Sequence, residues 1–282
     1  MTLQDFNRLD IERVKAILFQ CCGSSAWVEQ MASCLPFVTE KELLEKASQI
    51  WYEQCSEADW KASFEHHPKI GDINSLKEKF ASKEQASIEQ ADDTTIQNLA
   101  KANEEYFSKN GFIFIVCATG KSASEMLRLL NDRLSNSPGE EVRIAMGEQA
   151  KITVIRLKKS IPNANWSNTG GSQITTHVLD TSIGRPAKDL TIKLQENING
   201  DWLTVTQGVT NEDGRIADLL AAGKPLAFKT YQMVFQTAPY FNQNKLTVFY
   251  PEVSIQFTVL DKNHYHIPLL LNPFGYSTYR GS

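Results

Sequence analysis

The sequence predicts a multidomain protein of α and β structure, in which an all-α helical bundle is followed by an antiparallel β-sandwich. The chain has 282 residues, which exceeds one average domain, and its hydrophobic content of 41% is enough to bury two cores. All five cysteines precede residue 120, whereas seven of the ten prolines follow residue 160. This uneven composition indicates that the two halves fold differently.

Capping signals and helical periodicity fill the first 160 residues. The pairs Thr39–Glu42 and Ser122–Glu125 have the spacing of a capping box. Apolar side chains between residues 96 and 107 repeat at i, i+3 and i+4, and Gly111 follows where such a helix would end. The stretch 112–117 is the one strand-like interruption.

A polar segment separates the two predicted domains. A last helix is expected to begin at Pro138, and the residues around 160–172 are then rich in Gly, Asn and Ser, which is typical of a flexible connection. We therefore predict a helical domain over 1–159, a linker over 160–172 and a β domain over 173–282.

The C-terminal half contains short β-prone runs separated by turn signals such as Asp213-Gly214. Seven or eight such strands in about 110 residues favour a β-sandwich. The predicted strands cover residues 174–179, 190–194, 203–206, 230–235, 246–249, 255–260 and 264–271.

Charge and composition exclude several classes of function. A net charge of -4 and an isoelectric point near 5.8 argue against nucleic acid as a partner. The chain starts without the pattern of a signal peptide and has no apolar run of the roughly 18 residues that a membrane span needs. The C-terminal half has no cysteine, which favours a reducing compartment. We expect a soluble cytoplasmic protein with no membrane partner.

The five histidines fall at three places, namely His66 with His67, His177, and His264 with His266. Histidine is the side chain best suited to proton transfer near neutral pH. The last pair belongs to a terminal segment that is rich in tyrosine and arginine, and the apolar run 267–271 is expected to hold that segment in place.

Three segments of the C-terminal half carry a specific family resemblance: residues 174–187, Asp213-Gly214-Arg215, and the end of the chain from His264 to Tyr279-Arg280-Gly281-Ser282. Together they resemble 5-hydroxyisourate hydrolase, the enzyme branch of the transthyretin-like family. The resemblance implies a transthyretin-like sandwich, a homotetramer whose sites lie between subunits, and no cofactor. It implies catalytic roles for His177, Arg215, His266 and Ser282, and substrate binding by His264, Tyr279, Arg280 and Gly281.

The chemistry of these side chains agrees with hydrolysis. Opening a cyclic amide needs a water, a base and a cation that stabilises negative charge. His266 or His177 can be the base, and the arginines supply the cation. His264 and His266, two apart on a strand, should share one face. That spacing also suits a metal with His177 as third ligand, although no carboxylate is placed to complete the site. Histidines that only fill hydrogen bonds inside a sandwich are the remaining alternative.

The N-terminal half contains a second candidate site. His66-His67-Pro68 should end a helix, because proline disfavours helical geometry in the residue before it. With the stretches 82–85, 103–106 and 111–115 and the later Arg156, this motif resembles 2-oxo-4-hydroxy-4-carboxy-5-ureidoimidazoline (OHCU) decarboxylase, an all-helical family, over residues 5–158. The resemblance implies that His67 handles the proton with Glu84 as partner. It implies substrate binding by Pro68, Ser82, Gln85, Phe114, Ile115 and Arg156.

One motif departs from this second family, because Lys109-Asn110-Gly111-Phe112 replaces a sequence of the Phe-Gly-Phe type, which should affect packing more than chemistry. The reaction needs no cofactor, because the conjugated ring accepts the electrons left by carbon dioxide and the protein delivers one proton. Arg156 should be partly buried and therefore need an anion, either the substrate or Glu84. The bland alternative is a His-Pro helix cap and a surface arginine.

The sequence thus predicts a cofactor-free bifunctional enzyme of urate degradation. Its C-terminal domain would hydrolyse 5-hydroxyisourate to OHCU, and its N-terminal domain would convert OHCU to (S)-allantoin. Two alternatives stay open: a hydrolase whose helical domain serves only assembly, and a transthyretin-like ligand carrier without activity. The expected partners are these small-molecule substrates and further copies of the chain, with no nucleic acid and no metal.

Overall fold

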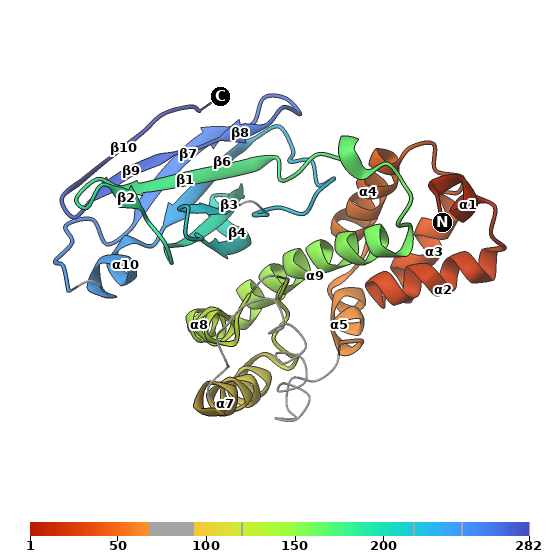
Figure 1. Ribbon diagram of the computed structural model, residues 1–282, viewed down its shortest axis with the longest axis horizontal. Helices are drawn as coiled ribbons and strands as arrows, with labels where there is room; N and C mark the ends of the chain where they lie inside the picture. Colours follow the sequence, from red (N-terminus) through yellow and green to blue (C-terminus); the bar gives the residue numbers. More distant parts are fainter. Residues whose placement is uncertain (68–92, 120, 217, 244, 282) are drawn as a thin grey trace.

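A computed structural model describes residues 1–67, 93–119, 121–216, 218–243 and 245–281. Figure 1 shows a helical half that holds the N-terminus and a β half that holds the C-terminus, with the long helix α9 between them. The described helices of the first half are α1 (Leu3–Asn7), α2 (Ile11–Cys22), α3 (Ser25–Ser33), α4 (Glu40–Gln49), the π-helical turn η1 (Ile50–Gln54), α5 (Glu57–Glu65), α7 (Asp93–Asn110), α8 (Ala123–Leu134) and α9 (Pro138–Ser160).

Side-chain caps begin most of these helices, as the sequence predicts. The Thr39 hydroxyl accepts a hydrogen bond from the Glu42 amide, and Ser122 forms a complete capping box with Glu125. Gly111 ends α7 in the left-handed region at φ +76°. α9 begins with Pro138 in its first turn, where a missing backbone N–H costs little.

A buried polar cluster joins α7, α8 and α9 inside the helical half. The Arg133 guanidinium is 3% exposed and donates to the Glu141 carboxylate and, at 2.8 Å, to the Ile115 carbonyl. The Tyr106 hydroxyl also donates to Glu141. Burial raises the pKa of Tyr106, while the Glu141 charge raises the pKa of Arg133 despite its desolvation. The cluster therefore holds a full charge pair inside the core.

The predicted strand at residues 112–117 is wrong, because this buried segment is irregular. No strand lies beside it in the described helical half, so its backbone groups find side-chain partners instead. The Cys117 amide donates to the Glu148 carboxylate at 2.7 Å, and the Cys117 carbonyl accepts from the Lys121 ammonium at 2.9 Å.

The β half is a sandwich of two sheets around its own core. One sheet has the order β10-β9-β1-β2, with β5 and β8 also paired to β1, and the other has the order β4-β3-β6-β7. The strands are β1 (Ile174–Asp180), β2 (Arg185–Pro186), β3 (Thr191–Ile198), β4 (Asp201–Val209), β5 (Arg215–Ile216), β6 (Thr230–Phe235), β7 (Val253–Thr258), β8 (Tyr265–His266), β9 (Leu269–Asn272) and β10 (Gly275–Thr278).

Three details of the β half differ from the prediction. The sheets are antiparallel except where β1 runs parallel to β8 and β9. The predicted strand 246–249 is irregular and follows the helix α10 (Thr237–Gln243), which the sequence pattern did not indicate. The expected strand 264–271 divides into β8 and β9 around Pro268, which has no N–H for the ladder.

The connection between the halves is ordered and packs on the helical half, so the expectation of a flexible segment is wrong. Ile161 is fully buried in the helical core, and Trp166 in the 3-10 turn η2 (Trp166–Asn168) donates its ring N–H to the Ile161 carbonyl at 3.1 Å. The Asn165 amide donates to Glu40 on α4 at 2.9 Å. The segment therefore packs through its few apolar residues, which its mainly polar composition did not indicate.

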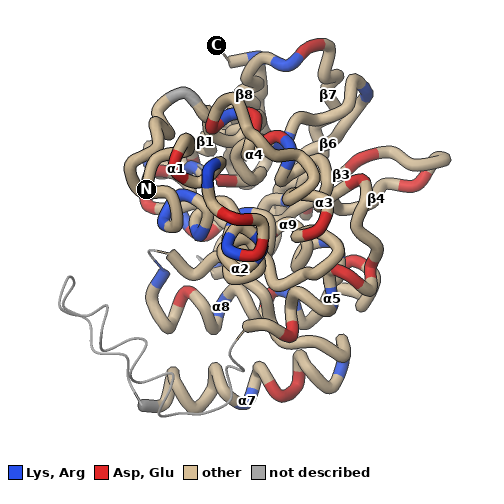
Figure 2. The backbone as a smooth tube through the Cα atoms, turned by 90° about the vertical axis from the view of Figure 1, so that its right-hand side faces the viewer, with Lys and Arg blue, Asp and Glu red and all other residues tan. Residues whose placement is uncertain are grey.

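Ion pairs connect α8 and α9 with the β half. Arg143 on α9 donates to the Thr204 carbonyl at 2.9 Å and pairs with Glu196 at 2.6 Å. Arg128 on α8 pairs with Asp189 at 2.8 Å. Basic and acidic positions are otherwise interspersed along the elements that Figure 2 displays. None of the described helices combines the length and apolar character needed to cross a bilayer.

Candidate active sites

The first site lies on the outward face of the sheet that contains β1. Alternate residues of β1 are buried, so Thr175 and His177 face outward together. The strand register places Arg215 opposite His177 and His266 beside Thr175. Four side chains that are far apart in the sequence are thereby brought onto one face.

Hydrogen bonds fix the orientation of these groups. The Thr175 hydroxyl lies 2.8 Å from His264 Nε2 and 2.9 Å from His266 Nδ1, and the two imidazole rings are stacked with centroids 6.4 Å apart. An Arg215 guanidinium nitrogen lies 3.2 Å from His177 Nδ1. His264 and His266 thus share a face, as their spacing predicts.

The surroundings of His177 and His266 favour the neutral form of both imidazoles. Burial and then the Arg215 charge lower the pKa of His177. Burial, followed by the charges of Arg215, His264 and His177, lowers the pKa of His266. A neutral imidazole can accept a proton from water, so either ring can act as a general base near neutral pH.

The terminal segment closes one side of this site. The Gly281 amide donates to the His266 carbonyl at 2.9 Å, and a side chain at Gly281 would collide with the His266 ring. The Arg280 guanidinium lies over the Tyr265 ring at 5.4 Å, and Tyr279 is 61% exposed. Ser282 lies outside the described residues. No group of three or more histidine, cysteine or acidic side chains suited to a metal occurs in the described part of the chain.

The second site lies where α5 ends against α9. α5 stops at Glu65, and His67 follows with its amide bonded to the Phe64 carbonyl. His67 Nε2 lies 2.5 Å from the side-chain oxygen of Gln149 on α9. His66 instead packs edge-on against Phe19. The His-Pro motif therefore presents one histidine to the interior and leaves the other on the surface.

Gln149 is a partner of His67 that sequence reasoning missed. It is fully buried, and its amide nitrogen donates to the Cys22 carbonyl at 3.3 Å and to the Thr153 hydroxyl at 3.2 Å. Its oxygen is therefore left to accept from His67 Nε2–H, which leaves Nδ1 as the basic nitrogen of the neutral ring. A glutamine among apolar helix positions was the available signal.

Arg156 lies on the same face of α9, seven residues after Gln149. It is half-buried and donates to the Cys21 carbonyl at 3.3 Å, at the C-terminal end of α2. His67 and Arg156 therefore gather around the end of one helix. The anion that Arg156 was expected to meet is not among the described residues.

The remaining predicted residues of this site divide into two groups. Phe114 and Ile115 are each 2% exposed, and both contact Arg133, Phe114 through its ring and Ile115 through its carbonyl. Four predicted residues lie outside the described part of the chain, namely Pro68, Ser82, Glu84 and Gln85.

Comparison with known proteins agrees with this division into two sites. The OHCU decarboxylase family model matches residues 7–158, and the HIUase/Transthyretin family model matches residues 174–281. The chain is 34% identical over 317 residues to the uric acid degradation bifunctional protein TTL of Arabidopsis thaliana, covering 93% of this chain and 96% of that protein.

The chain belongs to both families. The sandwich is 44% identical over 116 residues to 5-hydroxyisourate hydrolase 2 of Rhizobium meliloti (strain 1021), covering 39% of this chain and 96% of that protein. A crystal structure of (S)-allantoin synthase aligns over all of both chains with 25% identity and a TM-score of 0.48. The OHCU decarboxylase half thus contains the His67 site and the HIUase/transthyretin half contains the His177 site.

Proposed function

We propose that the chain is a bifunctional enzyme of urate degradation that converts 5-hydroxyisourate to (S)-allantoin in two steps. The observation that carries this proposal is that both families occur in one chain. The match to the uric acid degradation bifunctional protein TTL covers 93% of this chain and supports the same conclusion. The sandwich hydrolyses 5-hydroxyisourate to OHCU, and the helical half decarboxylates OHCU.

In the hydrolase, water attacks the carbonyl carbon of a cyclic amide. The C–N bond breaks as the proton taken from the water passes from the base to the leaving nitrogen, and a carboxylate forms. His266 or His177 accepts the proton of the water, which its lowered pKa and the adjacent hydrogen bonds support. Arg215, and Arg280 from the terminal segment, stabilise the oxyanion that develops. We assign a further catalytic role to Ser282, and substrate binding around these groups to His264, Tyr279 and Gly281.

In the decarboxylase, the C–C bond to the carboxylate breaks, and its electron pair moves into the conjugated ring before one carbon is protonated. His67 delivers this proton from Nδ1 of its protonated ring, while the Gln149 oxygen accepts from Nε2–H and fixes the orientation of the ring. Glu84 is the catalytic partner, and Arg156 binds the anionic substrate through N–H groups that its two backbone carbonyl contacts leave available. Delivery from one face explains formation of one enantiomer.

The assembly proposed is a homotetramer formed through the sandwich. Exposed apolar side chains gather on β9, β10 and the turn between them, and a second copy would cover them. These residues are Leu270, Phe274 and Tyr276. We also propose a cytoplasmic location, which five free cysteines support, four of them buried.

The test follows both steps in one sample. Absorbance measures the loss of freshly made 5-hydroxyisourate, and circular dichroism measures the optically active allantoin. The bifunctional enzyme accelerates both signals. A ligand carrier would leave both at the uncatalysed rate, and a hydrolase with an inert helical domain would accelerate only the first, so either result would reject the proposal.

Two variants separate the sites. His67→Ala should abolish the optically active product while hydrolysis continues, and His266→Ala should slow hydrolysis while decarboxylation of supplied OHCU continues. His66→Ala is the matched control for His67→Ala, because His66 is the neighbouring exposed imidazole. Enantioselective product from the His67→Ala protein would contradict the assigned role.

A further inference from the structure

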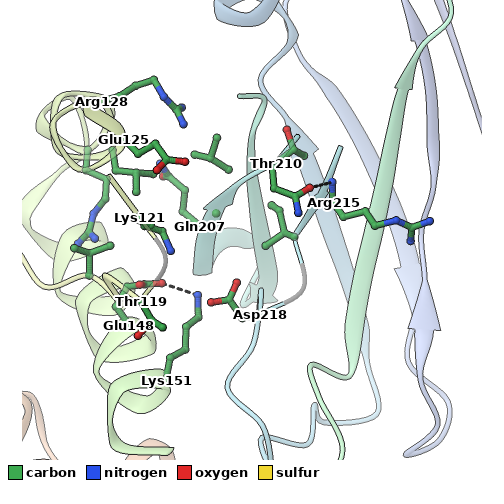
Figure 3. Close-up of a pocket in the computed structure, with 17 residues that line it drawn as sticks. Thr119, Lys121, Glu125, Arg128, Glu148, Lys151, Gln207, Thr210, Arg215 and Asp218 are labelled. Carbon is green, nitrogen blue, oxygen red and sulfur yellow. Dashed lines mark hydrogen bonds and ion pairs between the residues drawn. The ribbon is translucent and has the colours of Figure 1, made fainter. Parts of the chain in front are cut away.

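A cavity of about 240 Å³ lies between the two halves of the molecule (Figure 3). Its helical wall includes Lys121, Glu148 and Lys151, and its sandwich wall includes Gln207, Thr210 and Asn211. The volume far exceeds the roughly 10–15 Å³ that a single water needs. The cavity is therefore large enough for a small organic molecule, and residues of both halves line it.

Most charges around this cavity are already neutralised. Lys151 is 7% exposed and pairs with Glu148 at 2.6 Å, while Asp218 on the opposite wall adds a second negative charge nearby. Arg128 pairs across the boundary with Asp189, and Arg133 pairs with Glu141. The Glu125 carboxylate caps the first turn of α8.

Lys121 is different, because it forms no ion pair with any carboxylate that the structure describes. Its ammonium donates to the Cys117 carbonyl at 2.9 Å, which leaves two further N–H groups for a ligand. Figure 3 shows the Lys121 and Lys151 side chains extending toward the same space, opposite Gln207 and Asp218. One available cation beside amide and hydroxyl groups suits a small carboxylate that also carries urea-like groups.

Some residues of the cavity wall lie on elements that also carry the two sites. Arg215 contributes to the wall, and its guanidinium extends away to the outer face, where it meets His177. On the other side, Glu148 lines the cavity and its neighbour Gln149 contacts His67. Arg215 thus belongs to both the cavity wall and the hydrolase site, and on the helical side the residue that follows Glu148 on α9 contacts His67.

We propose that this cavity binds the carboxylated ureido intermediate that leaves the hydrolase and retains it for the decarboxylase, with Lys121 as the residue that recognises its carboxylate. The proposal rests on the bifunctional activity proposed above. The intermediate is unstable in water, so retention beside the second site raises its local concentration.

Binding is tested with allantoate, a stable ureido carboxylate, by isothermal titration calorimetry of the full chain. Lys121→Glu should weaken the allantoate site at least about tenfold, because it replaces a charge-assisted hydrogen bond with repulsion. Lys121→Arg should retain the site. Lys41→Glu is the matched control, since Lys41 is exposed on α4 away from the cavity.

Retention is tested by the lag before allantoin appears when 5-hydroxyisourate is the only substrate. For each protein, the observed lag is compared with the lag calculated from its own hydrolase rate and its own rate on OHCU supplied from solution. The wild type, Lys121→Arg and Lys41→Glu should show lags shorter than calculated, whereas Lys121→Glu should show the calculated lag.

The outcomes separate the two proposals. Missing single-step activity would reject the bifunctional assignment before any lag is considered. With both activities present, equal allantoate affinity of wild type and Lys121→Glu would overturn the cavity proposal. A wild-type lag equal to the calculated one would also overturn it.

Discussion

Replacing Gln149 with leucine should impair decarboxylation while leaving hydrolysis intact. Gln149 is fully buried, and its oxygen lies 2.5 Å from His67 Nε2. Leucine has a similar size and no polar atoms, so the substitution removes the group that orients the imidazole. The other partners of Gln149 are less affected, because the Cys22 carbonyl still accepts from Ser63 and the Thr153 hydroxyl still donates to the backbone of residue 149.

The magnitude follows from the single hydrogen bond that His67 loses. A hydrogen bond of this kind contributes about 1–1.5 kcal/mol, which corresponds to roughly a tenfold decrease in kcat if the orientation matters mainly in the transition state. The free energy of unfolding should fall by a similar amount, about 1–2 kcal/mol, because the lost amide bonds are partly replaced.

The assay measures kcat and KM on supplied OHCU by circular dichroism, and hydrolysis by absorbance. Gln49→Leu is the matched control, because Gln49 is exposed at the end of α4. A folded Gln149→Leu protein with kcat within about twofold of the wild type would refute the positioning role. An equal loss in both reactions would instead indicate general damage to the fold.

Three further substitutions test other parts of the structure. Burial and then the Arg215 charge hold the pKa of His266 below its usual value near 6.5, and Arg215→Gln removes that charge. Since the base acts when neutral, the acid limb of the hydrolase pH profile should move to higher pH, and an unmoved limb would contradict this coupling. Gly214→Ala puts a side chain at φ +67° against a β1 carbonyl. Hydrolase activity should fall, and chemical denaturation should show a decrease of about 1–3 kcal/mol in the free energy of unfolding. An unchanged free energy of unfolding would show that the turn relaxes. Arg133→Leu leaves the fully buried Glu141 without its cation and should cost about 3–5 kcal/mol in the same measurement, more than the double replacement of both residues.

The sequence predicts local structure well where the pattern is strong. The helix α9 begins at Pro138 and the strand β6 covers residues 230–235, both as predicted. Capping and alternation are local signals, so they can be recognised in the sequence alone. The segment 112–117 was wrongly predicted as a strand, because its β-branched and aromatic residues are as typical of a strand as of a buried irregular segment. Its actual partners, the side chains of Arg133 and Glu148, are distant in the sequence.

The sites were predictable to different degrees. His177, Arg215 and His266 stand out by residue type, and the strand register brings them together. Gln149 and Lys121 carry a weaker signal, because a single glutamine or lysine on a helix or loop usually belongs to a solvated surface. Their surroundings become visible only when the helices pack, and for Lys121 only when the second half is present.

The placement of α9 has a consequence for the evolution of this chain. Its Gln149 and Arg156 serve the first half, while Arg143 and its neighbour Glu140 hold the four-stranded sheet of the second. Substitutions on α9 are therefore constrained both by the site in the helical half and by the contacts with the sandwich. Where the two enzymes are encoded by separate genes, the positions equivalent to Glu140 and Arg143 should vary without constraint from the sandwich. Only in fused proteins should the charges at these positions vary together with those of their partners on strands β3 and β4.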